Sequence, residues 1–164
     1  MRQVLFAFAC ASILAACGPS QPSETSSSAT AAAPAAAPAP EVDMVAIQAQ
    51  IAALPAPYNE ADYEAGRRVF AQCRSCHTIE AGAPNRVGPN LHGLFGREIG
   101  SAEGFAYSSA VEEANFVWDG PKLDEWLANP RGFLPGNRMA FAGVRDATQR
   151  RDLIAYLKVE TASE

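Results

Sequence analysis

The most informative stretch of this chain is Cys73-Arg74-Ser75-Cys76-His77. Its pattern, C-x-x-C-H, is typical of covalent c-type haem attachment. Each thiol can add across a haem vinyl group to form a thioether, and the adjacent His can ligate the iron from one face. The pentapeptide therefore predicts one covalently bound haem c, with Cys73 and Cys76 as attachment points and His77 as an iron ligand.

A C-x-x-C motif can also bind zinc or carry out thiol–disulfide exchange. Downstream of residue 17, the only other Cys or His is His92, which would complete a Cys2His2 set. However, Cys76 and His77 are neighbours, and the two His are fifteen positions apart instead of the usual three to five. A dithiol redox site would be flanked by strands, and no strand pattern flanks this one. The residues therefore favour haem.

The second axial ligand is less certain from residue types alone. Met is a common sixth ligand in electron carriers. Of the three Met residues, only Met139 lies in a segment that looks folded, after the turn-forming pair Pro135-Gly136. His92 is the competing ligand, and an open iron is the third alternative. Residue type and position favour Met139.

Several further motifs resemble the class I cytochromes c of the mitochondrial type and their close bacterial relatives. The resemblance runs from about residue 60 to residue 158, and its motifs occur in the family's order. They are G-P-N-L-H-G-L-F-G-R at 88–97, G-F-A-Y-S at 104–108, Asn129-Pro130, P-G-N-R-M at 135–139, F-A-G at 141–143 and D-L-I-A-Y-L-K at 152–158.

The resemblance implies an all-α class I cytochrome c fold, with three main helices and long loops around one haem. It implies that His77 and Met139 are the axial ligands, that the Pro89 carbonyl accepts a hydrogen bond from the His77 ring, and that His92 is a structural loop residue. It also implies a set of cofactor-binding residues: Cys73, Cys76, His77, Pro89, Arg97, Tyr107, Trp118, Trp126, Met139 and Phe141.

Three positions depart from the mitochondrial pattern. Trp126 replaces a Tyr near the Met sulfur, Val111 replaces an Asn near the buried side of the haem, and Asn137 replaces a Thr that touches a propionate. Each substitution alters the hydrogen bonding expected near the iron. The resemblance therefore leaves the reduction potential open.

The expected function is one-electron transfer, without enzyme activity, between a quinol-oxidising cytochrome complex and a terminal oxidase or other acceptor. A haem peroxidase or gas-binding protein and a fixed subunit of a larger redox enzyme are the alternatives. We expect a monomer that docks on redox proteins through basic side chains near the haem edge: Arg86, Arg131, Arg138 and Arg145. The net charge of −5 argues against nucleic acid as a partner.

The N-terminal segment predicts export. Arg2 precedes an apolar run from Val4 to Ala16, which is too short to span a bilayer, and Cys17 follows. This pattern resembles a bacterial lipoprotein signal, so we expect a signal peptide over 1–16 and a lipid on Cys17. The domain would then lie on the periplasmic face of a bacterial membrane. A soluble periplasmic protein and an uncleaved signal anchor are the alternatives.

Three segments are expected after the signal. Residues 17–41 are rich in Ala, Pro and Ser and predict a flexible linker. Residues 42–58 are either a short helix, with Val45, Gln48, Ile51 and Ala52 on one face, or ordered linker. Residues 59–164 form the haem domain, with helices over 60–72 capped by Asn59, 121–128 capped by Asp119, and from Asp146 or Thr148 to about 159.

Overall fold

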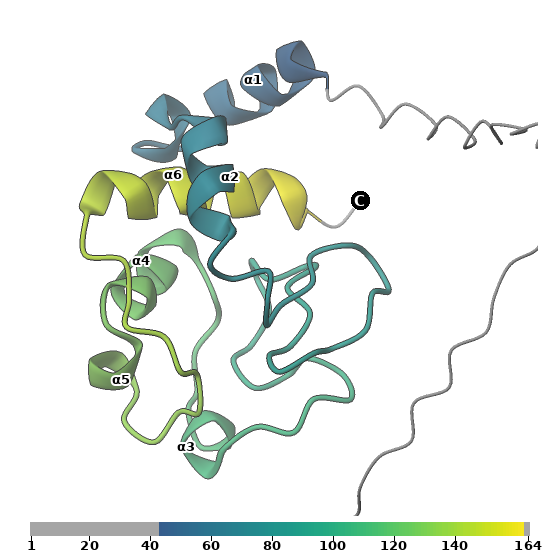
Figure 1. Cartoon of the computed structure of the whole chain (residues 1–164), viewed down its shortest axis with the longest axis vertical. Coiled ribbons are helices and arrows are strands. Elements are labelled where there is room, and N and C mark those ends of the chain that lie inside the picture. Colours follow the sequence, from purple (N-terminus) through teal and green to yellow (C-terminus); the bar gives the residue numbers. More distant parts are fainter. Residues whose placement is uncertain (1–42, 163–164) are drawn as a thin grey trace, which may run out of the picture. The chain divides into compact units, whose positions relative to one another are not determined.

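The computed structural model describes residues 43–162, which fold into helices joined by long loops (Figure 1). The expected signal peptide, Cys17 and the linker over 17–41 lie outside these residues. The three longer helices of the haem domain are α2 (Tyr63–Phe70), α4 (Gly120–Ala128) and α6 (Ala147–Glu160), and the shorter elements are η1 (Tyr58–Glu60), α3 (Ser109–Glu112) and α5 (Pro130–Phe133). A further helix, α1 (Met44–Ala52), precedes them. Within 43–162 no helix is long and apolar enough to cross a bilayer.

Aspartate side chains define where the three longer helices begin. The carboxylates of Asp119 and Asp146 accept hydrogen bonds from the backbone N–H groups of Lys122 and Gln149, as their sequence positions predict. The expectation that Asn59 caps the first helix is wrong. Asp62 is the cap, because its Oδ1 accepts from the Ala65 N–H at 2.9 Å, while residues 58–60 form a separate 3₁₀ turn.

Helices α2 and α6 cross and pack against each other (Figure 1). Gly66 permits this crossing, because a Cβ there would meet the carbonyl carbon of Asp152 and the Cβ of Tyr156, each at 2.7 Å. The Tyr156 ring lies between those of Tyr63 and Phe70, with 5.3 Å between ring centroids on each side.

Helix α1 packs on this pair through two isoleucines. Asp43 caps it by accepting hydrogen bonds from the N–H groups of Val45 and Ala46. Ile47 and Ile51 are buried against α2, α6 and η1, whereas Val45 is 82% exposed. The buried face of the helix therefore follows the i, i+4 pair at 47 and 51 instead of the predicted face that included Val45.

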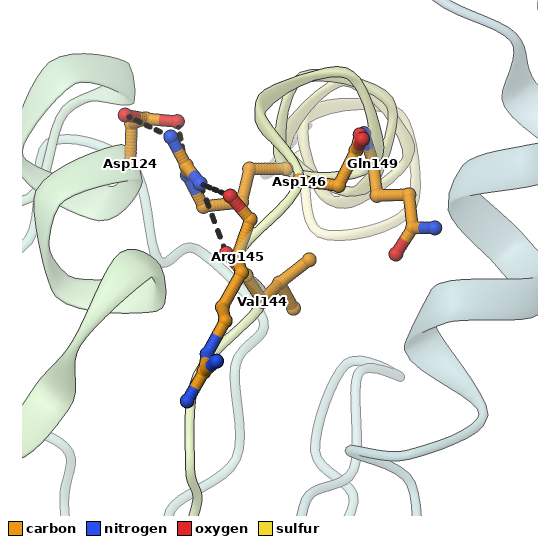
Figure 2. A network of polar contacts seen from close by, with 6 residues as sticks. Asp124, Val144, Arg145, Asp146 and Gln149 are labelled. Carbon is orange, nitrogen blue, oxygen red and sulfur yellow. Dashed lines mark hydrogen bonds and ion pairs between the residues drawn. The ribbon is translucent and has the colours of Figure 1, made fainter.

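Arg150 of α6 holds the chain that returns from the Met139 loop through hydrogen bonds to the labelled residues Asp124, Val144 and Arg145 (Figure 2). Its Nε donates to Asp124 Oδ1 on α4 at 2.8 Å, and its Nη1 donates to the carbonyl oxygens of Val144 and Arg145, each at 2.9 Å. One guanidinium thus joins α4, α6 and the segment that leads from the cavity wall back into α6.

Candidate haem site

A cavity of about 690 Å³ lies among α2, α4, α6 and the long loops. Its wall is mostly apolar, with a few polar side chains at defined places. All ten residues that the resemblance implies as cofactor-binding line it: Cys73, Cys76, His77, Pro89, Arg97, Tyr107, Trp118, Trp126, Met139 and Phe141. Residues from the N-terminal and C-terminal parts of the domain, between Phe70 and Leu157, therefore line one cavity.

The C-x-x-C-H stretch forms a turn directly after α2. The N–H groups of Cys76 and His77 donate to the Cys73 carbonyl at 3.0 and 2.9 Å, and both thiols are free and half-buried. Burial, and to a lesser extent the neighbouring Cys76, raises the pKa of Cys73 to about 11. Within residues 43–162 no group of three or more His, Cys, Asp or Glu side chains is arranged so that it could hold a metal ion. This part of the chain therefore does not offer the ligand set of a zinc site.

The His77 ring is held on one side by the Gly88-Pro89 backbone. His77 Nδ1 lies 2.8 Å from the Pro89 carbonyl oxygen, which can only accept, so Nδ1 carries the proton and Nε2 keeps its lone pair. Burial lowers the pKa of His77 and thus favours the neutral imidazole that binds a metal. At Gly88 a Cβ would strike the ring at Cε1 and lie 2.7 Å from Nε2, so only glycine allows this contact.

Met139 reaches the same cavity from the loop after α5, whereas His92 is not part of the wall. The His92 N–H donates to Asn90 Oδ1, and its carbonyl accepts from the Arg97 guanidinium at 3.0 Å. The structure therefore brings Met139, and not His92, to the cavity that contains His77.

A polar corner of the cavity contains Arg97, Tyr107 and Ser108. Arg97 also donates to the Asn90 carbonyl at 3.1 Å, and its burial lowers the pKa of its guanidinium. Ser108 Oγ is buried and has no hydrogen-bond partner among the described residues. The cavity wall thus contains a buried hydroxyl without a partner among these residues and a half-buried guanidinium, which suit a ligand with carboxylate groups, and haem has two. The sequence interpretation missed Ser108, although it ends the quoted G-F-A-Y-S motif.

The apolar walls come from aromatic and aliphatic side chains. The rings of Trp118 and Trp126 meet edge to face at a centroid distance of 5.6 Å, and both line the cavity. Val111, one of the three departures, is buried in the wall. Phe95 of the G-P-N-L-H-G-L-F-G-R motif is absent from the wall, and its ring centroid lies 4.2 Å from Lys158 Nζ.

This fold and this cavity define a c-type cytochrome domain with the class I fold. No family model matches the chain. It is 42% identical to cytochrome c of Kluyveromyces lactis over 105 residues, which cover 63% of this chain and 96% of that protein. It is 49% identical to cytochrome c of Chlamydomonas reinhardtii over 62% of this chain and 91% of that protein, and 46% identical to cytochrome c2 of Blastochloris viridis over 66% and 85%.

The chain belongs to the cytochrome c family. It is an electron-transfer protein and not an enzyme, and its cofactor is one covalently bound haem c. The cavity fits this cofactor, since the thiols, an imidazole, a thioether and a polar corner line one apolar space. The aligned part covers nearly the whole of the Kluyveromyces relative, so the remaining third of this chain is additional to it.

Proposed function

We propose that Cys73 and Cys76 carry the two thioethers and that His77 and Met139 are the axial ligands of a low-spin haem. The observation that carries this proposal is the meeting of Met139 with the C-x-x-C-H turn at one cavity, although the two are far apart in the sequence. Met ligation raises the reduction potential of a haem iron. When bound, haem c supplies a reversible one-electron change at its iron.

The protein side chains would orient this cofactor and exclude water from it. The Pro89 carbonyl fixes the His77 ring and increases its basicity as a ligand. Trp118, Leu123 and Leu127 are buried in the apolar wall, which limits solvent rearrangement when the charge changes. Arg97, Tyr107 and Ser108 would bind the propionates at the polar corner. With both axial positions filled by protein, no position remains for a substrate.

We infer that the electron donor is a quinol-oxidising cytochrome complex and the acceptor a terminal oxidase or a similar redox protein. The four proposed docking residues, Arg86, Arg131, Arg138 and Arg145, are all exposed, and Arg138 also lies at the cavity wall. Because the whole chain carries a net charge of −5, the attraction to an acidic partner would be local. Electron-transfer rates that do not change with added salt would exclude this face as the docking site.

We also propose that the domain is periplasmic and tethered to a membrane through a lipid on Cys17, after removal of residues 1–16. The cytochrome c2 among the relatives comes from a bacterium. Residues 18–41 would span roughly 30 Å as a coil and about 70 Å as a polyproline helix, which keeps the domain at high effective concentration near membrane partners. The intact mass of the protein from its native membranes distinguishes a lipidated chain starting at Cys17 from a soluble or uncleaved chain.

The experiment that tests axial ligation compares the wild-type holoprotein with Met139→Ala and His92→Ala. We expect Met139→Ala to lose the absorption band of the thioether–iron(III) bond and to bind carbon monoxide when reduced. His92→Ala should keep the band and exclude carbon monoxide. Carbon monoxide binding by the reduced wild type would instead support a gas-binding or peroxidase function.

A further inference from the structure

The side chain of Asn137 makes three hydrogen bonds within the loop that presents Met139. Its Nδ2 donates to the carbonyl oxygens of Pro130 at 2.9 Å and Leu134 at 2.7 Å. Its Oδ1 accepts from the Met139 N–H at 2.9 Å. One half-buried amide thus ties the first residue of α5 to the backbone of Met139.

Few other hydrogen bonds hold this part of the loop, and one of them joins the Arg138 guanidinium to the Ala106 carbonyl. Among the described residues, the Met139 N–H is the only backbone donor between 138 and 143 that makes a hydrogen bond, and its acceptor is Asn137. The turn before it requires Gly136, whose φ is +89°. Regular backbone bonding resumes at Val144, whose N–H donates to the Leu127 carbonyl at 2.8 Å.

The two ends of the loop are therefore fixed on α4 and α5, and Asn137 restrains its middle. Asn137 also lines the cavity, so loss of its amide would open space on the side where the loop faces the haem. A short polar side chain that bonds a backbone N–H two residues ahead stabilises one turn conformation over the alternatives. Here the N–H two residues ahead belongs to Met139.

We propose that Asn137 is a positioning residue that holds the Met139 thioether in place for the haem iron. It acts through the Met139 backbone and does not itself touch the iron. This inference rests on the proposed His77/Met139 ligation. It adds that the hydrogen bond from the Met139 N–H to Asn137 opposes dissociation of the Met139 thioether from the iron.

The test measures how readily imidazole displaces the Met ligand from the oxidised holoprotein. The variants are Asn137→Ala, which removes all three hydrogen bonds, and Asn137→Ser, whose hydroxyl can still accept from the Met139 N–H. We expect Asn137→Ala to bind imidazole at least about tenfold more tightly than the wild type, because the competing Met ligand is less well held. Asn137→Ser should lie between the two.

Asn85→Ala is the matched control. Asn85 Oδ1 accepts from the Asn90 N–H and Asn85 Nδ2 donates to the Glu103 carbonyl, both at 2.8 Å, but it lies on the loop beside His77. This variant should lower stability towards denaturant while leaving imidazole affinity near the wild-type value. Equal imidazole affinities for Asn137→Ala and wild type would overturn the proposal, as would an equally large change in Asn85→Ala.

The failure of this inference and of the proposed ligation can be told apart. If the wild type lacks the thioether–iron(III) absorption band, Met139 is not a ligand and both proposals are wrong. If the wild type shows the band and Asn137→Ala keeps both the band and the wild-type imidazole affinity, only the role of Asn137 is refuted. Should Asn137→Ala fail to mature, Asn137→Leu, which fills the space but can neither accept from the Met139 N–H nor donate to the two carbonyls, replaces it, and an unchanged imidazole affinity in that variant would refute the role of Asn137.

Discussion

The substitution Gly66→Ala tests the packing of α2 on α6, which supports one side of the haem cavity. In a solvent-exposed helix this change stabilises, because alanine favours the helix over glycine by about 1 kcal/mol. At the crossing, the added methyl group would lie 2.7 Å from the Asp152 carbonyl carbon and 2.7 Å from the Tyr156 Cβ. Ordinary contacts between carbon atoms are about 3.5–4.0 Å, so the two helices must move apart.

The magnitude follows from two opposing effects. Overpacking a rigid core costs about 1–3 kcal/mol, and the upper end applies because the obstructing atoms are backbone and Cβ atoms that no rotamer change can move. Subtracting the gain of about 1 kcal/mol in helix propensity leaves a net loss of about 2 kcal/mol in the free energy of unfolding. For a domain of this size, that corresponds to a fall in Tm of about 10 °C.

The assay is denaturant and thermal unfolding of the haem-loaded protein, followed by circular dichroism. Ala65→Gly is the matched control, because it changes helix propensity one position away and should destabilise by about 1 kcal/mol. Arg68→Ala, on the exposed face of α2, should change stability by less than about 0.5 kcal/mol. If Gly66→Ala were as stable as the wild type or more stable, the reasoning from close approach would be refuted.

Three further predictions concern pH, a polar network and the cofactor. Burial, and then the 2.6 Å hydrogen bond to Glu160, raises the pKa of Tyr63 above 10, so the folded state keeps this proton longer than the unfolded state. The protonated Tyr63 therefore contributes fully to the free energy of unfolding below pH 10, and this contribution is lost as pH rises above 10. Tyr63→Phe should flatten the fall in the free energy of unfolding between about pH 10 and 12. An unchanged dependence of that free energy on pH would contradict this expectation. Arg150→Ala should lower the free energy of unfolding by about 2–3 kcal/mol, because the Val144 and Arg145 carbonyls lose their hydrogen-bond donor (Figure 2). An effect below about 0.5 kcal/mol would show that water replaces the guanidinium as the donor. Without haem the chain should be largely unfolded by circular dichroism, because the apolar wall of the 690 Å³ cavity loses its packing partner. A closed void of that size would cost about 17 kcal/mol at about 24 cal/mol per Å³, which is an upper bound for a site open to solvent. A helical apo-protein would refute this expectation.

Much of the site could be inferred from local sequence because its chemistry is local. The C-x-x-C-H turn places two thiols and an imidazole within five residues, and a turn that follows a helix keeps them together. The caps at Asp119 and Asp146 were also predictable, because a capping carboxylate bonds an N–H only three residues away.

Other features depended on contacts between distant residues. Asn and Asp are both residue types that cap helices, and the sequence interpretation chose Asn59. In the structure Asp62 is the cap, because its carboxylate accepts a hydrogen bond from the Ala65 N–H. Its backbone N–H donates to Asp152 of α6 at 3.2 Å, a partner 90 positions away, which fixes where α2 starts. The buried face of α1 was likewise set by what Ile47 and Ile51 meet on α2 and α6.

The class of cofactor, the attachment turn and the candidate ligands can be predicted from residue types, because they depend on short, fixed spacings along the chain. Three other features follow from the tertiary structure. Met139, and not His92, lines the cavity, and Ser108 has a buried hydroxyl without a partner among the described residues. Asn137 accepts a hydrogen bond from the Met139 backbone. Each of these depends on how loops close around one apolar space. Loop closure is set by contacts across the whole domain, which no short stretch of sequence contains.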